Sequence, residues 1–187
     1  MKQLKKHLGF VKHLDEFRFK RWLDRNASQF LTKVGVMAGQ EVLDFGCGSG
    51  TYTIPAGKLV GEAGRVYALD VSVTALDRME KRACEEGLKN IMRIDASGDG
   101  NIQLEDETLD HILLIDVLQE IENREALFDE VYRTLKAGGI MTVYPMHMAE
   151  EEVIRLAANR SLNLEEKKFN RILIFREPTQ EQPSFKK

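Results

Sequence analysis

Cysteine is scarce in this chain, and the residue types that bind metals form no compact motif. Cys47 and Cys84 are the two cysteines among 187 residues, and no Cys-x-x-Cys or His-x-x-x-His run occurs. Two distant cysteines are too few for a disulfide framework or for a cysteine-rich zinc site. We therefore expect no metal centre, and we expect the reducing environment of the cytoplasm.

Long apolar runs and a strong charge bias are also missing. No stretch approaches the roughly 18 consecutive apolar residues of a membrane-spanning helix, and residues 1–30 alternate charged with apolar positions, unlike a signal peptide. The net charge of -3 argues against a surface that coats nucleic acid. With 43% hydrophobic and 30% charged residues, the composition indicates a globular protein without membrane insertion.

Three segments differ in their patterning. Residues 1–35 show apolar positions at helical spacing, which predicts two helices with a break near Asn26. This extension carries eight basic residues up to Arg25, interpreted as the solvated face of a packing helix rather than a nucleic-acid arm. Residues 36–177 form the main domain, and residues 178–187 form a polar tail with two prolines that is expected to fray.

Within the main domain, strand and helix patterns alternate. Strands are expected at 41–45, 65–69, 90–94, 109–115 and 140–144, with a closing antiparallel pair at 162–169 and 171–176. Helices are expected at 51–60, 72–87, 125–135 and 150–159, the third stopped by the glycines at 138 and 139. Repeated strand–helix units predict an α/β fold with a parallel sheet and right-handed crossovers.

The most informative stretch is the glycine-rich turn after the first strand. Glycine recurs at Gly46, Gly48 and Gly50, Asp44 precedes the turn, and the second strand ends at Asp70, 20 residues after Gly50. An acidic residue at that point can bind ribose hydroxyls. The spacing differs from the G-x-G-x-x-G that holds a pyrophosphate, and Asp44 would repel one. We therefore expect a ligand that presents an ammonium group and hydroxyls.

Several ordered motifs carry a resemblance to a known family. They are VLDFGCGSG, VYALDVS, IDAS, ETLDHILLIDVLQEI and LKAGGIMTV, spread over residues 39–177. Together they resemble the class I S-adenosylmethionine-dependent methyltransferases, most of all the branch with the quinone-biosynthesis enzymes, also described as methyltransferase type 11. The resemblance implies a Rossmann-like three-layer sandwich whose seven-stranded, mostly parallel sheet has one antiparallel strand. It also implies S-adenosylmethionine as cofactor and S-adenosylhomocysteine as product.

The resemblance assigns cofactor roles to residues that follow the strands. Asp44 would hold the cofactor ammonium group directly or through water, Asp70 both ribose hydroxyls, and Asp95 the adenine amino group. Val71 would pack on adenine, with Ala96 beside Asp95. The remaining expected cofactor-binding residues are Gly46, Cys47, Gly48 and Gly50 in the turn, and Leu114 and Asp116 at the end of the fourth strand, where a backbone carbonyl would meet the cofactor's amino-acid part.

The acceptor side is less defined. Asp116-Val-Leu-Gln119 lacks the proline and aromatic residue of enzymes that methylate base amines, and Gln119 stands where many small-molecule members carry a histidine. His147, after the fifth strand, is a candidate general base or a loop histidine satisfied by backbone or water. The resemblance implies that the N-terminal extension lies over the cofactor cleft as a lid, so Phe17, Phe19 and Trp22 could line a substrate pocket or pack in the core.

We expect methyl transfer to a small molecule. Three alternatives stay open: a nicotinamide-dependent oxidoreductase, an RNA or protein methyltransferase that docks through its basic N-terminal segment, and a cofactor-binding protein without turnover. The spacing of the glycine turn and Asp44 argue against the first alternative.

Overall fold

A mixed sheet forms the centre of the molecule. The computed structural model describes residues 2–98 and 100–178, with side chains from residue 14 onward. The strands are β1 (Glu41–Phe45), β2 (Arg65–Asp70), β3 (Ile91–Asp95), β4 (Leu109–Ile115), β5 (Leu135–Tyr144), β6 (Asn163–Lys168) and β7 (Ile172–Arg176). They form one seven-stranded sheet in the order β3-β2-β1-β4-β5-β7-β6, in which β7 runs antiparallel to both of its neighbours. The predicted sheet with one reversed strand is confirmed.

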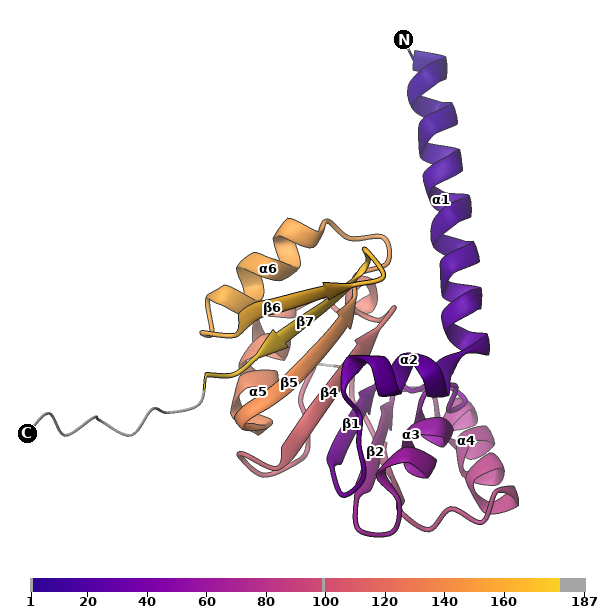
Figure 1. Ribbon diagram of the computed structural model, residues 1–187, viewed down its shortest axis with the longest axis vertical. Helices are drawn as coiled ribbons and strands as arrows, with labels where there is room; N and C mark the ends of the chain where they lie inside the picture. The colour runs from indigo at the N-terminus through magenta and orange to yellow at the C-terminus, as the bar shows by residue number, and fades with distance from the viewer. Residues whose placement is uncertain (1, 99, 179–187) are drawn as a thin grey trace, which may run out of the picture.

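Helices cover both faces of this sheet (Figure 1). They are α1 (Lys2–Arg25), α2 (Ala27–Val34), α3 (Thr53–Val60), α4 (Val73–Glu85), α5 (Arg124–Thr134) and α6 (Glu150–Ala158), with a 3-10 turn η1 (Leu118–Glu120). Strand order reverses between β1 and β4, because β1 pairs with β2 on one side and with β4 on the other. Ligands of open α/β sheets bind beyond the carboxyl ends of the strands at such a point.

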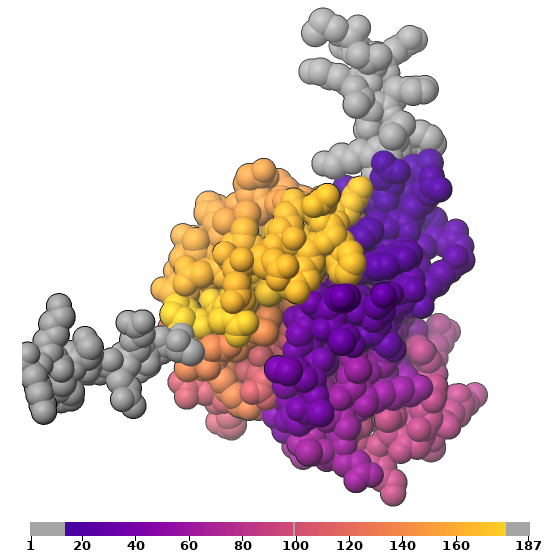
Figure 2. All heavy atoms as spheres, viewed as in Figure 1, coloured from indigo at the N-terminus to yellow at the C-terminus, as the bar shows by residue number. Residues whose placement is uncertain are grey.

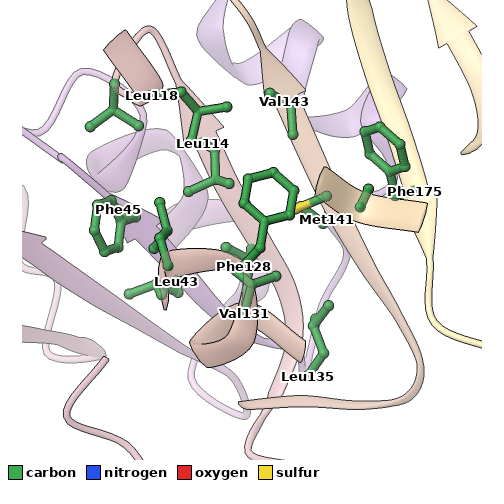
Figure 3. Close-up of a cluster of buried hydrophobic side chains, with 14 of the residues drawn as sticks. Leu43, Phe45, Leu114, Leu118, Phe128, Val131, Leu135, Met141, Val143 and Phe175 are labelled. Carbon is green, nitrogen blue, oxygen red and sulfur yellow. The ribbon is translucent and has the colours of Figure 1, made fainter. Parts of the chain in front are cut away.

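Each face of the sheet has its own hydrophobic core. Successive side chains of β1 point to opposite faces, so Val42 packs with α2 and α3 while Leu43 packs with α5 and α6. Figure 3 shows the second cluster, with the ring of Phe128 from α5 directed toward strand side chains that include Leu43 and Met141. Phe128 is fully buried, and truncation of such a residue to alanine costs about 3–5 kcal/mol.

Most element boundaries lie within two residues of the sequence expectation, and the start of β5 differs more. Strand β5 begins at Leu135 rather than at residue 140, because Leu135 pairs with Leu109 before the ladder shifts register and resumes at Ile140. Gly138 and Gly139 lie within the strand where the β4–β5 pairing shifts register, and they do not form a separate turn before it. A Cβ on Gly139 would lie 2.8 Å from the Lys136 carbonyl oxygen. Helix α3 begins at Thr53, two residues later than expected.

The N-terminal extension forms the two helices expected from the sequence. Helix α1 ends at Arg25 and α2 begins at Ala27, with Asn26 between them donating its side-chain amide to the Trp22 carbonyl at 2.7 Å. Figure 1 shows α1 projecting away from the sheet toward its N-terminus. Figure 2 shows the described part of α1 against the C-terminal strands, where Phe19 and Trp22 contact Phe169.

The division at residue 35 stays a prediction, and the predicted tail lies outside the described residues except for Pro178. Over the described residues, no helix has the length and apolarity needed to cross a membrane.

Candidate functional site

A cleft of about 410 Å³ opens at the carboxyl ends of β1, β2 and β4. It lies where the strand order reverses. Its lining residues are Phe45, Gly46, Leu69, Asp70, Val71, Ala96, Gly98, Gly100, Asn101, Asp116, Val117, Glu120 and Ile121. The structure therefore brings together five residues expected from the sequence, namely Gly46, Asp70, Val71, Ala96 and Asp116.

The glycine turn reaches the cleft at Gly46, and its backbone requires glycine. Gly46, Gly48 and Gly50 have φ angles of 75°, 53° and 83°, in the left-handed region that side chains disfavour. The amides of Gly46 and Cys47 both donate to the Leu69 carbonyl, at 2.8 and 3.0 Å, which ties the turn to the end of β2. A Cβ on Gly46 would meet Val117 at 2.5 Å, whereas a Cβ on Gly48 would meet nothing within 4 Å. The turn thus has open space beside Gly48.

Asp70 spans from the turn to the next helix. Its Oδ2 accepts the Gly48 amide at 2.8 Å, and its Oδ1 accepts the Ser72 amide at 2.8 Å. Ser72 in turn caps α4 by accepting the amide of Ala75. Each carboxylate oxygen can accept more than one hydrogen bond, so Asp70 can also receive hydroxyls from a ligand in the cleft.

Asp44 lies beneath the turn rather than in the cleft wall. It is 2% exposed, and its Oδ2 accepts the Thr53 hydroxyl at 2.6 Å. Burial raises its pKa to about 6; the bond from Thr53 and the charge of Lys20 oppose this rise, and the charge of Asp70 adds to it. Burial also raises the pKa of Cys47 far above its ordinary range, so its thiol stays protonated.

Asp116 closes the cleft at the end of β4. Its φ of 59° is unusual for a residue with a side chain, and such strain tends to occur at functional sites. The Gln119 amide donates to both the Asp116 carbonyl and its Oδ1 at 2.9 Å. Burial raises the pKa of Asp116, while the charges of Lys20 and His147 and the Gln119 bond lower it. The buried Oε1 of Gln119 has no partner among the described residues, so it can accept an N–H from a ligand.

Six expected cofactor residues are not among the residues that line the cleft: Asp44, Cys47, Gly48, Gly50, Asp95 and Leu114. The Asp95 carboxylate forms a forked pair with Arg93, at 2.8 and 2.7 Å, and is not among the cleft residues. Arg93 lowers the pKa of Asp95 by this bond and also binds Asp77 and Glu80. The Leu114 side chain is fully buried in the core, and the contact expected at this position is made by the backbone carbonyl, so it stays a prediction.

A second cavity of about 440 Å³ lies beyond β5. It is lined by Glu16, Tyr144, Pro145, Met146, Met148, Ala149, Glu150, Glu151, Asn170 and Arg171. His147, with a φ of 63°, places its Nδ1 3.7 Å from the Glu16 Oε2. Of the three aromatics expected near a pocket, Phe19 packs edge-on against Tyr144, Trp22 contacts Phe169, and Phe17 is 53% exposed. None of the three lines the cavity.

The last turns of α1 contribute groups that sequence reasoning missed. The Lys20 ammonium lies 2.7 Å from the Asp24 Oδ1, which also accepts the Tyr52 hydroxyl at 2.7 Å. Lys20 also lies 5.4 Å from the centroid of the Tyr52 ring. The i, i+4 spacing of Lys20 and Asp24 predicts their ion pair. No local signal predicts that they reach Tyr52, which flanks the glycine turn. Within the described part of the chain, no group of three or more His, Cys, Asp or Glu could hold a metal ion.

Comparisons with known proteins agree with this geometry. A family model described as "Methyltransferase domain" matches residues 43–143. A demethylmenaquinone methyltransferase of Geobacillus sp. (strain WCH70) is 31% identical over 109 residues, 58% of this chain and 46% of that protein. A second demethylmenaquinone methyltransferase, from Lactobacillus johnsonii, is 27% identical over 128 residues, 68% of this chain and 52% of that protein. The chain thus spans about half the length of the curated relatives it matches.

Solved structures share the fold. A SAM-dependent methyltransferase from Aquifex aeolicus superposes with a TM-score of 0.71 at 22% identity, covering 82% of this chain and 90% of that one. The magnesium protoporphyrin IX methyltransferase from Synechocystis PCC 6803, with bound SAM, superposes with a TM-score of 0.63 at 17% identity, covering 85% of this chain and 79% of that one. At these identities the likeness establishes the fold.

Proposed function

This chain belongs to the methyltransferase-domain family, and we propose that it transfers a methyl group from S-adenosylmethionine to a small-molecule acceptor. The observation that carries the proposal is the cleft at the reversal of strand order, where the glycine turn, Asp70 and Asp116 meet. Relatives with this domain are named for methylation of demethylmenaquinone, a small molecule.

The residues around the cleft fit the cofactor chemically. S-adenosylmethionine supplies a methyl group on a positively charged sulfur, and it also carries an ammonium group and two ribose hydroxyls. Asp70, held by the Gly48 and Ser72 amides, would accept the ribose hydroxyls. Asp44 and Asp116 add negative charge near the turn, which favours a cationic ligand. The open space beside Gly48 allows close approach to the backbone.

The acceptor would enter from the second cavity. Tyr144 of that cavity is the last residue of β5, which lies next to β4 and Asp116 in the sheet, and Met146 follows it by two residues. For an acceptor with a hydroxyl, His147 would take the proton released on methyl transfer, with Glu16 orienting its ring. Gln119 cannot take a proton, but its buried Oε1 can orient a donor group. Most of the rate enhancement would come from aligning the acceptor atom with the methyl group and excluding water.

The first experiment measures cofactor binding by calorimetry. The full chain is titrated with S-adenosylhomocysteine and, separately, with NAD. Binding of the first ligand alone supports the proposal. Absence of S-adenosylhomocysteine binding by a folded protein contradicts it, and binding of NAD instead supports the oxidoreductase alternative.

The second experiment measures transfer of radiolabelled methyl from S-adenosylmethionine to a reduced demethylmenaquinone analogue, simple phenols, amines and total RNA. Labelled small-molecule product supports the proposal. Label in RNA, sensitive to salt and to removal of residues 1–25, supports the RNA alternative. With a hydroxyl acceptor, His147→Asn should lower the rate by about 10²-fold or more, the usual contribution of a general base. An unchanged rate would remove His147 from the mechanism.

A further inference from the structure

The last turns of α1 place a cation beside the glycine turn. Lys20 is held by Asp24 at 2.7 Å and by the face of the Tyr52 ring at 5.4 Å. Asp24 is itself fixed by the Tyr52 hydroxyl at 2.7 Å. Tyr52 follows Gly50 by two residues and precedes the first residue of α3. These three side chains therefore connect α1 to the point where the turn becomes a helix.

The surroundings of this cation are strongly acidic. The carboxylates of Asp44, Asp70 and Asp116 lie at the ends of the three neighbouring strands β1, β2 and β4. The charge of Lys20 lowers the pKa of both Asp44 and Asp116, so its ammonium group acts on the floor of the turn and on the end of β4. The Lys20 side chain is 19% exposed, so solvent screens this charge only partly.

The cofactor of the proposed function has one group that these carboxylates cannot bind. Its methionine part carries a carboxylate beside the ammonium group. Asp44 and Asp116 attract the ammonium group but repel the carboxylate. Because the two groups are bonded to the same carbon atom, the carboxylate needs a cation a few ångströms from these aspartates. An ammonium group has three donors, and Lys20 uses one on Asp24.

Another basic group near the turn is Arg82 of α4. Its Nη1 donates to the Ser49 carbonyl at 2.6 Å, and the bond is exposed. Arg82 thus braces the backbone of the turn from α4, whereas Lys20 approaches from α1.

From this geometry we propose that Lys20 binds the carboxylate of the methionine part of the cofactor, with Asp24 and Tyr52 as the residues that position it. The inference rests on the proposed function. It gives α1 a definite role, because the helix supplies one wall of the cofactor site. A chain that lacks α1 would keep the adenosine contacts and lose the carboxylate contact.

The test compares two ligands that differ only in the carboxylate. S-adenosylhomocysteine and S-adenosyl-3-thiopropylamine, which lacks that group, are titrated by calorimetry into the full chain and into Lys20→Met. Methionine keeps most of the apolar stem of Lys20 and removes the charge. We expect Lys20→Met to weaken S-adenosylhomocysteine binding by at least about tenfold, the scale of a charge-assisted hydrogen bond. We expect it to change binding of the amine by no more than about twofold, because that ligand makes no contact with Lys20.

Three variants complete the experiment. Lys33→Met, at an exposed position on α2, should leave both affinities unchanged, and Lys20→Arg should keep the preference for the carboxylate. Equal losses for both ligands in Lys20→Met, or no loss for either, would overturn the inference. A selective loss in Arg82→Met instead of Lys20→Met would also overturn it. If the wild-type chain binds neither ligand, the proposed function itself fails, and that result is visible before any variant is measured.

Discussion

Replacing Asp44 with asparagine should stabilise the protein and weaken cofactor binding. The Asp44 carboxyl is 2% exposed, and burial raises its pKa from an ordinary 3.8 to about 6. Because the pKa is higher in the folded state, the carboxyl group stabilises the fold most at pH values below 3.8. This contribution is lost as the pH rises through 6. At about 1.4 kcal/mol per pKa unit, the loss amounts to about 3 kcal/mol above pH 7.

Asparagine does not titrate and can still accept the Thr53 hydroxyl bond. We therefore expect Asp44→Asn to unfold at a free energy up to about 3 kcal/mol higher than wild type at pH 8. The difference should shrink toward zero near pH 4. Urea unfolding at pH 8, 6 and 4.5 measures the free energy of unfolding of the wild type and of Asp44→Asn. The exposed Glu62→Gln serves as the matched control, with an expected difference within about 0.5 kcal/mol at each pH.

Cofactor binding should change in the opposite direction. The ionised Asp44 would attract the cofactor ammonium group, directly or through water, so S-adenosylhomocysteine should bind Asp44→Asn at least about tenfold more weakly at pH 8. Its affinity for wild type should fall as the pH drops below 6, when Asp44 is protonated. A variant no more stable than wild type at pH 8, or a stability gain independent of pH, would refute the reasoning from burial.

Three further predictions concern the cleft and the core. Asp70→Asn should weaken S-adenosylhomocysteine binding by about 2 kcal/mol, because an amide cannot accept two hydroxyls and the Gly48 and Ser72 amides as a carboxylate does. Calorimetry on the folded variant measures the loss, and equal binding would exclude the ribose contact. Gly48→Ala and Gly39→Ala both place a Cβ at a positive φ, and at both positions this Cβ meets no atom within 4 Å. Each variant should therefore lose about 1 kcal/mol of stability, and only Gly48→Ala should also lose cofactor binding. Equal cofactor binding by both variants would show that no ligand approaches Gly48. Burial lowers the pKa of His111 from 6.5 to about 3, so the neutral ring contributes stability that is fully present above pH 6.5 and is lost as the pH falls toward 3. His111→Gln should therefore make the free energy of unfolding depend less on pH between 6.5 and 3. An unchanged pH dependence would refute the lowered pKa of His111.

The sequence by itself determined the elements whose causes are local. Near-continuous apolar runs placed β1 and β4 where they are, and the break at Asn26 separated α1 from α2 as expected. Glycines at three alternate positions required a left-handed turn after β1, and Asp70 at the end of β2 followed from the same pattern. Each of these features depends on the conformations that a residue and its near neighbours allow.

The tertiary structure decided which residues the long polar side chains contact. Asp95 ends its strand as expected, but Arg93 binds its carboxylate outside the cleft. Lys20 lies 32 positions before Tyr52 in the chain and meets it because the last turns of α1 lie beside Tyr52 and the end of β5. The early start of β5 depended on a pairing with Leu109 from another strand. Contacts of this kind depend on how separate elements pack, and packing is a property of the whole chain that no local pattern contains.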